Sequence, residues 1–248
     1  MGWPGVATTT AAVRAVGAVP RGLARRGAPL IGRLTGPAEP DADVSRERYR
    51  AIAAAYDERT AAGASYRRRS VLALAPRRGE RIVDVGCGTG LNFALVEEGI
   101  GPGGTLIAVD ASPEMLERAH ARVRQNGWRN VVLVNAAADA LELGDTADAA
   151  LLCGVHDVMR STPALANVLR QVRAGGRVVA GGPKWAPWWR PGSAALNLST
   201  RAANRDYVTT FEGFDRPWSK LAELVEDVDV EEVLFGGGYI ARGVLPGR

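Results

Sequence analysis

Residues 82–93, IVDVGCGTGLNF, contain three glycines within five positions, Gly86, Gly88 and Gly90. The apolar run before the glycines is typical of a buried strand, and the residues after them are typical of the start of a helix. Glycine lets the backbone turn sharply and approach a ligand without a clash from a Cβ atom. The first N–H groups of the following helix can bind an anionic group. The segment therefore predicts a loop that binds a cofactor.

The spacing of the glycines and one carboxylate decide between classes of cofactor. The dinucleotide fingerprint G-x-G-x-x-G/A requires a small residue at position 91, where this chain has Leu91. The loop sequence contains no lysine, which excludes a P-loop. The apolar run 105–110 ends in Asp110, 20 residues after Gly90, where a carboxylate can accept hydrogen bonds from both ribose hydroxyls. These features favour a nucleoside cofactor without a pyrophosphate.

Short apolar runs alternate with helical segments through most of the chain, and these elements must position the loop. The alternation predicts an α/β fold with a doubly wound, mostly parallel sheet whose strands are buried on both faces. Segments 228–236 and 238–245 flank a Gly-rich joint and predict a C-terminal antiparallel hairpin, which completes an expected seven-stranded sheet. The other expected strands are 81–85, 105–110, 130–134, 148–153 and 177–181, and the expected helices are 44–58, 63–75, 91–99, 112–127 and 162–176.

Two of these helices carry recognisable ends. Ser112 and Thr162 are expected N-caps because each precedes a proline at the first helical turn. Gly127 and Gly175 are the expected C-terminal ends of the same two helices.

The charge of the chain is distributed unevenly. Residues 1–40 contain five arginines and one acidic residue, whereas the remainder carries 26 basic and 26 acidic residues. The Gly, Ala, Pro and Arg-rich composition of 1–40 predicts a disordered extension, with attraction to anionic lipid or to a partner as the alternative. Residues 41–248 are expected to form the folded domain. Its neutral balance excludes a nucleic-acid partner on charge grounds.

Composition and cysteine usage limit the class of protein. Hydrophobic residues make up 46% and charged residues 23% of the 248 residues, as in ordinary globular proteins. The two cysteines could form one disulfide at most, which cannot serve as the framework of a chain of this length, and they fit a reduced, cytoplasmic compartment. The sequence has no run of 18 apolar residues, so no spanning helix is expected.

The glycine loop and the acidic strand end resemble the class I S-adenosylmethionine-dependent methyltransferases, of type 11/25. VDVGCGTG, residues 83–90, is similar to the first motif of this family, and AVDAS, residues 108–112, is similar to the second. The resemblance covers about residues 45–245 and implies a Rossmann-like fold with S-adenosylmethionine as cofactor. A weaker similarity to phosphatidylethanolamine N-methyltransferase-like and ubiquinone/menaquinone-type members rests on Tyr56-Asp57, on GTGLN and on the tryptophans of 183–218.

The resemblance also implies residues for the cofactor site. Asp84 would support the loop and the methionine amino group, and Asp110 would hold the ribose. Tyr49 or Tyr56, in the helical segment 44–75, would close over the cofactor. The other implied contacts border the methionine half, the adenine or the sulfonium: Gly86, Cys87, Gly88, Gly90, Ala111, Met115, Ala138, Asp139, Cys153 and Gly154. Simpler interpretations are a core position for Met115, an exposed loop carboxylate for Asp139 and inert packing for the Cys87 thiol.

His156 and Asp157 follow the fourth expected strand, at the edge where doubly wound sheets bind ligands. A general base is needed only if the methyl acceptor must lose a proton. His156 is therefore the candidate base or acceptor ligand, with Asp157 beside it. The alternatives are a histidine that orders its own loop and an aspartate that caps the next turn.

Other members of the family have features that this chain lacks. The amino methyltransferases of DNA and protein glutamine carry Asn/Asp-Pro-Pro-aromatic after the fourth strand, where this chain has Gly154-Val155-His156-Asp157. The cytosine enzymes need a Pro-Cys nucleophile, whereas Cys153 follows Leu152. No carboxylate cluster has metal-ligand spacing, so no metal is expected. These exclusions leave a small-molecule or lipid acceptor.

Residues 183–218 form a long insertion rich in aromatic residues and proline. We expect it to supply a lid or wall for an apolar acceptor. Alternatively, Trp188 and Trp189 enter a membrane interface, or the aromatic residues form a satellite core. The candidate acceptor contacts are Trp185, Trp188, Trp189, Tyr207 and Phe211.

The function expected from these features is methyl transfer in the cytoplasm from S-adenosylmethionine to oxygen, nitrogen or carbon of a hydrophobic small molecule, such as a specialised metabolite. A phospholipid amine N-methyltransferase at the membrane surface is one alternative, in which the basic N-terminal segment makes a peripheral membrane contact. A non-catalytic cofactor-binding module is the other. An NAD-dependent oxidoreductase is disfavoured by Leu91.

Overall fold

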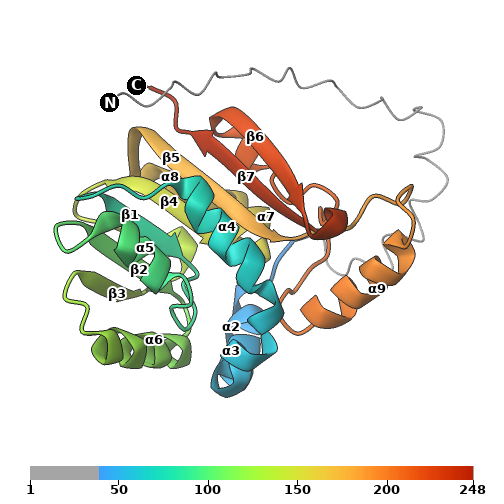
Figure 1. Ribbon diagram of the computed structural model, residues 1–248, viewed down its shortest axis with the longest axis horizontal. Coiled ribbons are helices and arrows are strands. Elements are labelled where there is room, and N and C mark those ends of the chain that lie inside the picture. The colour runs from blue at the N-terminus through green and yellow to red at the C-terminus, as the bar shows by residue number, and fades with distance from the viewer. Residues whose placement is uncertain (1–38, 248) are drawn as a thin grey trace, which may run out of the picture. The chain divides into compact units, whose positions relative to one another are not determined.

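The computed structural model describes residues 39–247, and these residues lie within one compact unit. Within them, seven strands form one sheet in the order β3-β2-β1-β4-β5-β7-β6 (Figure 1). The expected α/β fold, a mostly parallel doubly wound sheet with a C-terminal antiparallel hairpin, is therefore confirmed. The extension expected over residues 1–40 falls, except for its last two residues, outside the described residues.

Strands β1 to β5 run parallel, and β7 runs antiparallel to both of its neighbours, β5 and β6. β1 and β2 are central and almost wholly buried, which explains why their sequences are apolar without alternation. The strands are β1 Arg81–Val85, β2 Thr105–Asp110, β3 Val131–Asn135, β4 Ala147–Cys153, β5 Val172–Pro183, β6 Glu226–Val233 and β7 Gly238–Val244.

The fifth strand begins earlier than its sequence pattern predicts. The helix expected over 162–176 ends at Arg170, and β5 starts at Val172. Val172 pairs with Ala147 of β4 before a register shift, and Gly175 lies within the strand at a φ of +68°. Long-range pairing with β4 thus overrides the helical pattern of the last residues, and the prediction of helix over them was wrong.

Helices cover both faces of the sheet (Figure 1). Residues of α4, α5 and α6 pack with one face of the strands, and residues of α7 and α8 pack with the other. Each face therefore has its own hydrophobic core, as a doubly wound fold requires. The helices are α2 Ala42–Ile52, α3 Tyr56–Arg59, α4 Ala64–Leu74, α5 Phe93–Ile100, α6 Pro113–Asn126, α7 His156–Arg160, α8 Thr162–Arg170 and α9 Ser193–Asn204.

Three helical details differ from the sequence pattern. The helix expected over 44–58 is interrupted by a 3-10 turn at Ala53–Ala55, which separates α2 from α3. α7 has five residues, too few to show a helical period in the sequence. α9 lies inside the insertion 183–218, where no helix was predicted from the sequence.

The helix ends were predicted correctly for α6 and incorrectly for α8. Ser112 Oγ accepts a hydrogen bond from the N–H three residues on, at 3.3 Å, and α6 ends at Gly127 with a φ of +67°. α8 is capped by Ser161 and not by Thr162, because the extended backbone at Ser161 lets its Oγ reach the N–H three residues on, also at 3.3 Å.

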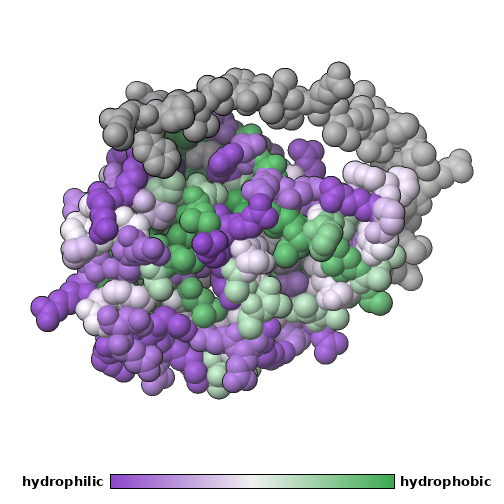
Figure 2. Space-filling model, viewed as in Figure 1, coloured by the Kyte–Doolittle hydropathy of each residue, from purple (hydrophilic) through white to green (hydrophobic). Residues whose placement is uncertain are grey.

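The outer surface of α6 is polar. Figure 2 shows hydrophilic side chains gathered over this helix, which carries two glutamates and three arginines. Within residues 39–247, none of the helices combines the length and the apolar character that a membrane crossing requires.

The tight packing of the glycine loop on α5 gives a stability prediction. Gly90 has a φ of +83°, and a Cβ placed there would lie 2.5 Å from the ring of Phe93, which is fully buried and has no room to move. Gly127 also has a positive φ, +67°, but a Cβ there would meet open space. We expect Gly127→Ala to lose about 1–2 kcal/mol of unfolding free energy from backbone strain alone. Gly90→Ala should lose about 1–3 kcal/mol more, from overpacking. Urea unfolding of the two variants measures the difference, and equal losses would contradict the packing argument.

Candidate functional site

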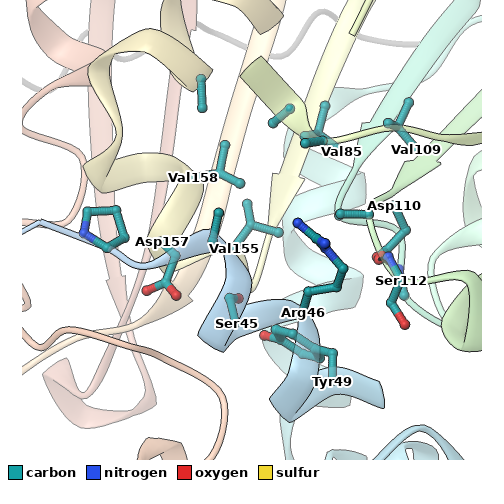
Figure 3. Close-up of a pocket in the computed structure, with 18 of the residues that line it drawn as sticks. Ser45, Arg46, Tyr49, Val85, Val109, Asp110, Ser112, Val155, Asp157 and Val158 are labelled. Carbon is teal, nitrogen blue, oxygen red and sulfur yellow. Dashed lines mark hydrogen bonds between the residues drawn. The ribbon is translucent and has the colours of Figure 1, made fainter. Parts of the chain in front are cut away.

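A cavity lies at the carboxyl ends of β1, β2 and β4, with α2 over it and the start of α7 at its side (Figure 3). This is the edge at which doubly wound sheets bind ligands. The structure brings twelve of the sequence-predicted site residues to its walls: Tyr49, Tyr56, Gly86, Gly88, Asp110, Ala111, Ala138, Asp139, Gly154, His156, Asp157 and Tyr207.

Gly86 and Gly88 shape the wall of the cavity that follows β1. Both have a positive φ, +65° and +57°. A Cβ at Gly86 would lie 2.3 Å from Val155 Cγ1, so the segment after β4 leaves no space for a side chain there. A Cβ at Gly88 would contact the Tyr56 ring at 3.6 Å. The loop therefore presents bare backbone to the cavity, as a bound cofactor would require.

Asp110 joins this loop to the neighbouring strand. Its Oδ2 accepts the N–H of Gly88 at 2.8 Å, and its Oδ1 accepts the N–H of Ser112 at 2.9 Å. Burial raises the pKa of the Asp110 carboxyl, and these backbone N–H groups offset part of that rise. The carboxylate keeps free lone pairs on the cavity side, where it can accept hydrogen bonds from a ligand.

Asp84 lies behind the loop, not in the cavity wall. It is fully buried and accepts hydrogen bonds from Asn92 Nδ2 at 3.2 and 3.4 Å. Burial raises the pKa of Asp84 to about 7. Within the described residues, Asn92 Oδ1 is also buried and has no partner. Asp84 thus fastens the loop to α5 in this structure, and its contact with a methionine amino group stays a prediction.

Three tyrosine rings form the wall opposite the sheet. Tyr49 and Tyr56 come from α2 and α3, and Tyr207 follows α9. Their ring centroids lie 6.0–6.3 Å apart in all three pairs. Burial raises the pKa of Tyr49, so its phenol stays neutral at physiological pH. Neutral aromatic faces at this place can stabilise a cation in the cavity.

His156 lines the cavity at the start of α7 with one ring nitrogen already engaged. Its Nε2 lies 3.1 Å from the carbonyl oxygen of Glu212, and because a carbonyl only accepts, Nε2 carries the proton. Nδ1 is then the acceptor, and it is buried without a partner in the described part of the chain. The ring packs on Phe214, with centroids 4.4 Å apart. Burial lowers the pKa of His156 to about 4, so the ring is neutral and weakly basic.

Asp157 connects three segments around the cavity. Its carboxylate accepts the backbone N–H of Thr209 at 3.1 Å and the Thr209 hydroxyl at 2.9 Å. The same hydroxyl oxygen accepts the N–H of Asp41, which caps α2. Asp157 therefore holds the insertion and the start of α2 against α7.

The aromatic insertion contributes less to the cavity than the sequence predicts. Tyr207 reaches the wall, whereas Trp185 stacks on Phe211 with centroids 5.3 Å apart and planes at 21°. These two rings belong to a small cluster with Val208 and Phe214, the satellite core that was the alternative interpretation. Trp188 and Trp189 are exposed on the surface.

Four other expected cofactor contacts, Met115, Gly90, Cys87 and Cys153, do not line the cavity. Met115 is a fully buried core residue of α6, and Gly90 packs on α5. Burial raises the pKa of the Cys87 thiol, and that of Cys153 to about 12, so both thiols are unreactive. The roles assigned to these residues stay predictions.

Part of the cavity wall was not singled out from the sequence. Ser45 and Arg46 lie one helical turn before Tyr49 and on the same face of α2. Once Tyr49 is assigned to the cavity, this spacing predicts that Ser45 and Arg46 line it too. Val85 and Val109 are the last or next-to-last residues of their strands, so sheet geometry places them at the same edge. The other additions are Pro40, Ala42, Ser112, Ala136, Ala137, Val155, Val158, Ser161 and Ala164.

The sequence of the parallel strands is similar to a family of known proteins. Residues 82–176 match the family described as methyltransferase domain. Over these residues the chain resembles a class I methyltransferase domain. Nocamycin O-methyltransferase of Saccharothrix syringae is 32% identical over 118 residues, which are 44% of this chain and 39% of that protein. An uncharacterized transposon protein of Streptomyces fradiae is 34% identical over 136 residues, which are 51% of this chain and 36% of that protein. The chain thus spans well under half the length of these relatives.

A solved structure shows the same fold. The N-methyltransferase NodS from Bradyrhizobium japonicum superposes with a TM-score of 0.52 at 17% identity, over 73% of this chain and 94% of that chain. At this identity the likeness concerns the fold and not the substrate.

S-adenosylmethionine is the cofactor that these similarities support, and the cavity has features that this cofactor needs. Gly86 and Gly88 line the cavity without side chains of their own, and Asp110 lines it beside them. Tyrosine rings stand where they can face a positive sulfur. Within residues 39–247, no group of three or more His, Cys, Asp or Glu side chains is arranged to hold a metal ion.

Asp110 gives the first prediction for this site. We expect Asp110→Asn to weaken binding of S-adenosylhomocysteine by about 10- to 100-fold, because a hydrogen bond to a charged acceptor contributes about 1.5–3 kcal/mol. Titration calorimetry measures the affinity, and thermal unfolding checks that the variant is folded. Asp145→Asn is the matched control, since that side chain is 86% exposed. Unchanged affinity in the Asp110 variant would remove this carboxylate from the donor site.

His156 gives a prediction about pH. Its pKa is about 4 in the folded protein, against the ordinary value of 6.5, so between these values the unfolded chain binds the extra proton. The contribution of neutral, buried His156 to the free energy of unfolding is therefore fully present above about pH 6.5, and it is lost as the pH falls toward 4.

The measurement compares unfolding free energies of the wild type and His156→Gln at several pH values. We expect the wild type to lose about 3 kcal/mol relative to the variant between neutral pH and pH 4. His120→Gln, at an exposed position of α6, is the control. A constant difference over this range would show that the His156 ring is not buried in its neutral form.

Proposed function

We propose that this protein transfers a methyl group from S-adenosylmethionine to an acidic oxygen of a hydrophobic small molecule. One observation carries the proposal: in a chain similar to methyltransferase domains, two glycines of the loop after β1, the Asp110 carboxylate and three tyrosine rings line one cavity. Transfer to oxygen of a small molecule is supported by the similarity to nocamycin O-methyltransferase.

The donor half of the site follows from the residues on the sheet edge. S-adenosylmethionine, when bound, supplies a methyl group on a positively charged sulfur. Asp110 would accept hydrogen bonds from the ribose hydroxyls, and the bare backbone of Gly86 and Gly88 would allow close approach of the methionine half. Tyr49 and Tyr56 would exclude water and face the positive charge.

The acceptor half supports an acidic substrate. Burial lowers the pKa of His156 to about 4, which makes its free Nδ1 a weak base at neutral pH. A weak base suffices for a carboxylic acid, an acidic enol or a phenol whose substituents lower its pKa to about 7 or below, because these groups are already ionised at neutral pH. His156 would then orient the acceptor and Asp157 would hold the surrounding loops, so neither has to remove a proton.

Arg46 is the cationic group that such an acceptor would meet. Among the described residues that line the cavity, Arg46 is the one with a permanent positive charge. In Figure 3 its side chain extends from α2 between Val155 and Asp110. Its ion pair with Asp43, at 2.8 Å, is exposed to solvent and therefore weak, so the guanidinium can exchange this partner for a substrate anion.

The proposal is tested with purified protein, labelled S-adenosylmethionine and a panel of apolar acceptors that differ in one group: carboxylic acid, phenol, neutral alcohol or amine. We expect turnover with the acids or phenols and little with the amines. Turnover confined to amines would overturn the acidic-oxygen assignment. Donor binding without turnover on the whole panel would favour a non-catalytic module.

Arg46→Gln tests the acceptor half alone. We expect the KM for the acidic acceptor to rise at least about tenfold, equivalent to about 1.4 kcal/mol, with little change in kcat or in affinity for S-adenosylhomocysteine. Arg50→Gln is the matched control, because Arg50 lies one turn later on α2, pairs with Glu47 and does not line the cavity. If Arg46→Gln weakens donor binding and leaves the acceptor KM unchanged, Arg46 serves the donor and not the acceptor.

A further inference from the structure

Two neighbouring turns present large apolar side chains to solvent. Trp188, Trp189, Leu234 and Phe235 are 80%, 59%, 43% and 92% exposed, and we call these four residues the aromatic patch. Single exposed apolar residues are ordinary on protein surfaces, but four of them on two adjacent turns are a candidate interaction site.

The four residues come together although they lie far apart in the sequence. Trp188 and Trp189 occupy the tip of a turn closed by a hydrogen bond from the N–H of Arg190 to the oxygen of Pro187, at 3.0 Å. Phe235 occupies the tip of the turn between β6 and β7. A Cβ added to Gly236, the residue after Phe235, would lie 3.0 Å from Pro187 Cδ, so the two tips are adjacent. Figure 1 shows the β6–β7 turn beside the loop that leads into α9.

The backbone of the second turn is strained. Leu234 and Phe235 have φ values of +53° and +55°, in the left-handed region that bulky residues rarely adopt. Phe235 gains no packing in return, because almost all of its side chain faces solvent. Backbone strain that no packing of the phenylalanine offsets suggests that the exposed ring contacts something other than this domain.

A buried lysine holds both turns in place. Lys184 is 2% exposed, and its Nζ donates to the oxygens of Trp185 and Gly236 at 2.9 and 3.1 Å. Lys184 also pairs with Glu232, at 3.0 Å, and Glu232 pairs in turn with Arg190 of the first turn, at 2.7 Å. These contacts hold the backbone of the two turns in place, which lowers the entropy cost of binding a partner surface.

The aromatic patch lies at the same edge of the sheet as the cavity. β5 ends at Pro183, which pairs with Gly238 at the start of β7. The first turn comes shortly after Pro183, and the second turn comes shortly before Gly238. This is the carboxyl edge of the parallel strands, where the cavity also opens. A surface that covers the patch would thus face the same edge of the protein as the methyl-transfer site.

The charge of the sequence indicates what that surface is. Residues 1–38 contain five arginines and no acidic residue, a composition that is attracted to anionic lipid. Tryptophan and phenylalanine are the side chains that favour the boundary between lipid headgroups and acyl chains. We propose that the aromatic patch inserts into the surface of an anionic lipid bilayer, with the arginines of residues 1–38 adding electrostatic attraction.

The test uses the full chain and two kinds of vesicle, phosphatidylcholine alone and phosphatidylcholine mixed with phosphatidylglycerol. We expect the wild type to sediment with the mixed vesicles, and its tryptophan emission to be quenched by lipids brominated in the acyl chain. The double variant Trp188→Ser/Phe235→Ser should bind at least about tenfold more weakly and lose most of the quenching. Val132→Ser is the matched control, because Val132 is 50% exposed on β3, at the opposite end of the sheet.

Each outcome decides the proposal. Absence of wild-type binding to the mixed vesicles, or equal binding and quenching in the patch variant and the wild type, would overturn it. Sedimentation velocity without lipid tests the alternative that a second copy of the chain covers the patch. A dimeric wild type and a monomeric patch variant would favour that alternative over the lipid surface. Binding of S-adenosylhomocysteine to every variant shows that each is folded. No acceptor is present in these measurements, so their result is independent of the proposed methyl transfer.

Discussion

The sharing of one carboxylate between two backbone segments sets the geometry of the site. Asp110 accepts the N–H of Gly88 from the loop after β1 and the N–H of Ser112 from the start of α6. These bonds join two adjacent crossover connections at the point where the strand order reverses on either side of β1. Because Asp110 lines the cavity, the remaining acceptor capacity of its carboxylate is available to a ligand there.

The sheet and the donor side of the site were predictable because local spacing and sheet geometry agree. Apolar runs located five parallel strands, and the glycines after β1 and the acid after β2 must meet at one edge whatever the details of packing. The contribution of α2 was not predictable in the same way. Arg46 and Ser45 reach the cavity because α2 is fastened by contacts with Thr209 and Tyr207, residues about 160 positions away. No local pattern encodes such a contact.

The insertion shows why clustered aromatic residues are ambiguous in a sequence. A lid over an acceptor and a small core under a loop both require tryptophan and phenylalanine in the same short segment. In the structure the segment divides: Trp185 and Phe211 stack on one another, Tyr207 enters the cavity wall, and Trp188 and Trp189 face solvent. α9, which was not predicted, separates Trp188 and Trp189 from Tyr207 and Phe211 along the chain, so side-chain types alone did not reveal the division.

The hydroxyl of Thr209 makes two hydrogen bonds to different segments: it accepts the backbone N–H of Asp41 and donates to the carboxylate of Asp157. Lifting α2 from the cavity must break the first of these bonds, and displacing the insertion must break the second. α2, which lies over the cavity, and α7, which lies beside it, are therefore joined through the one hydroxyl group of Thr209. Thr209 thus couples the cover of the cavity to the aromatic insertion, although it does not itself line the cavity.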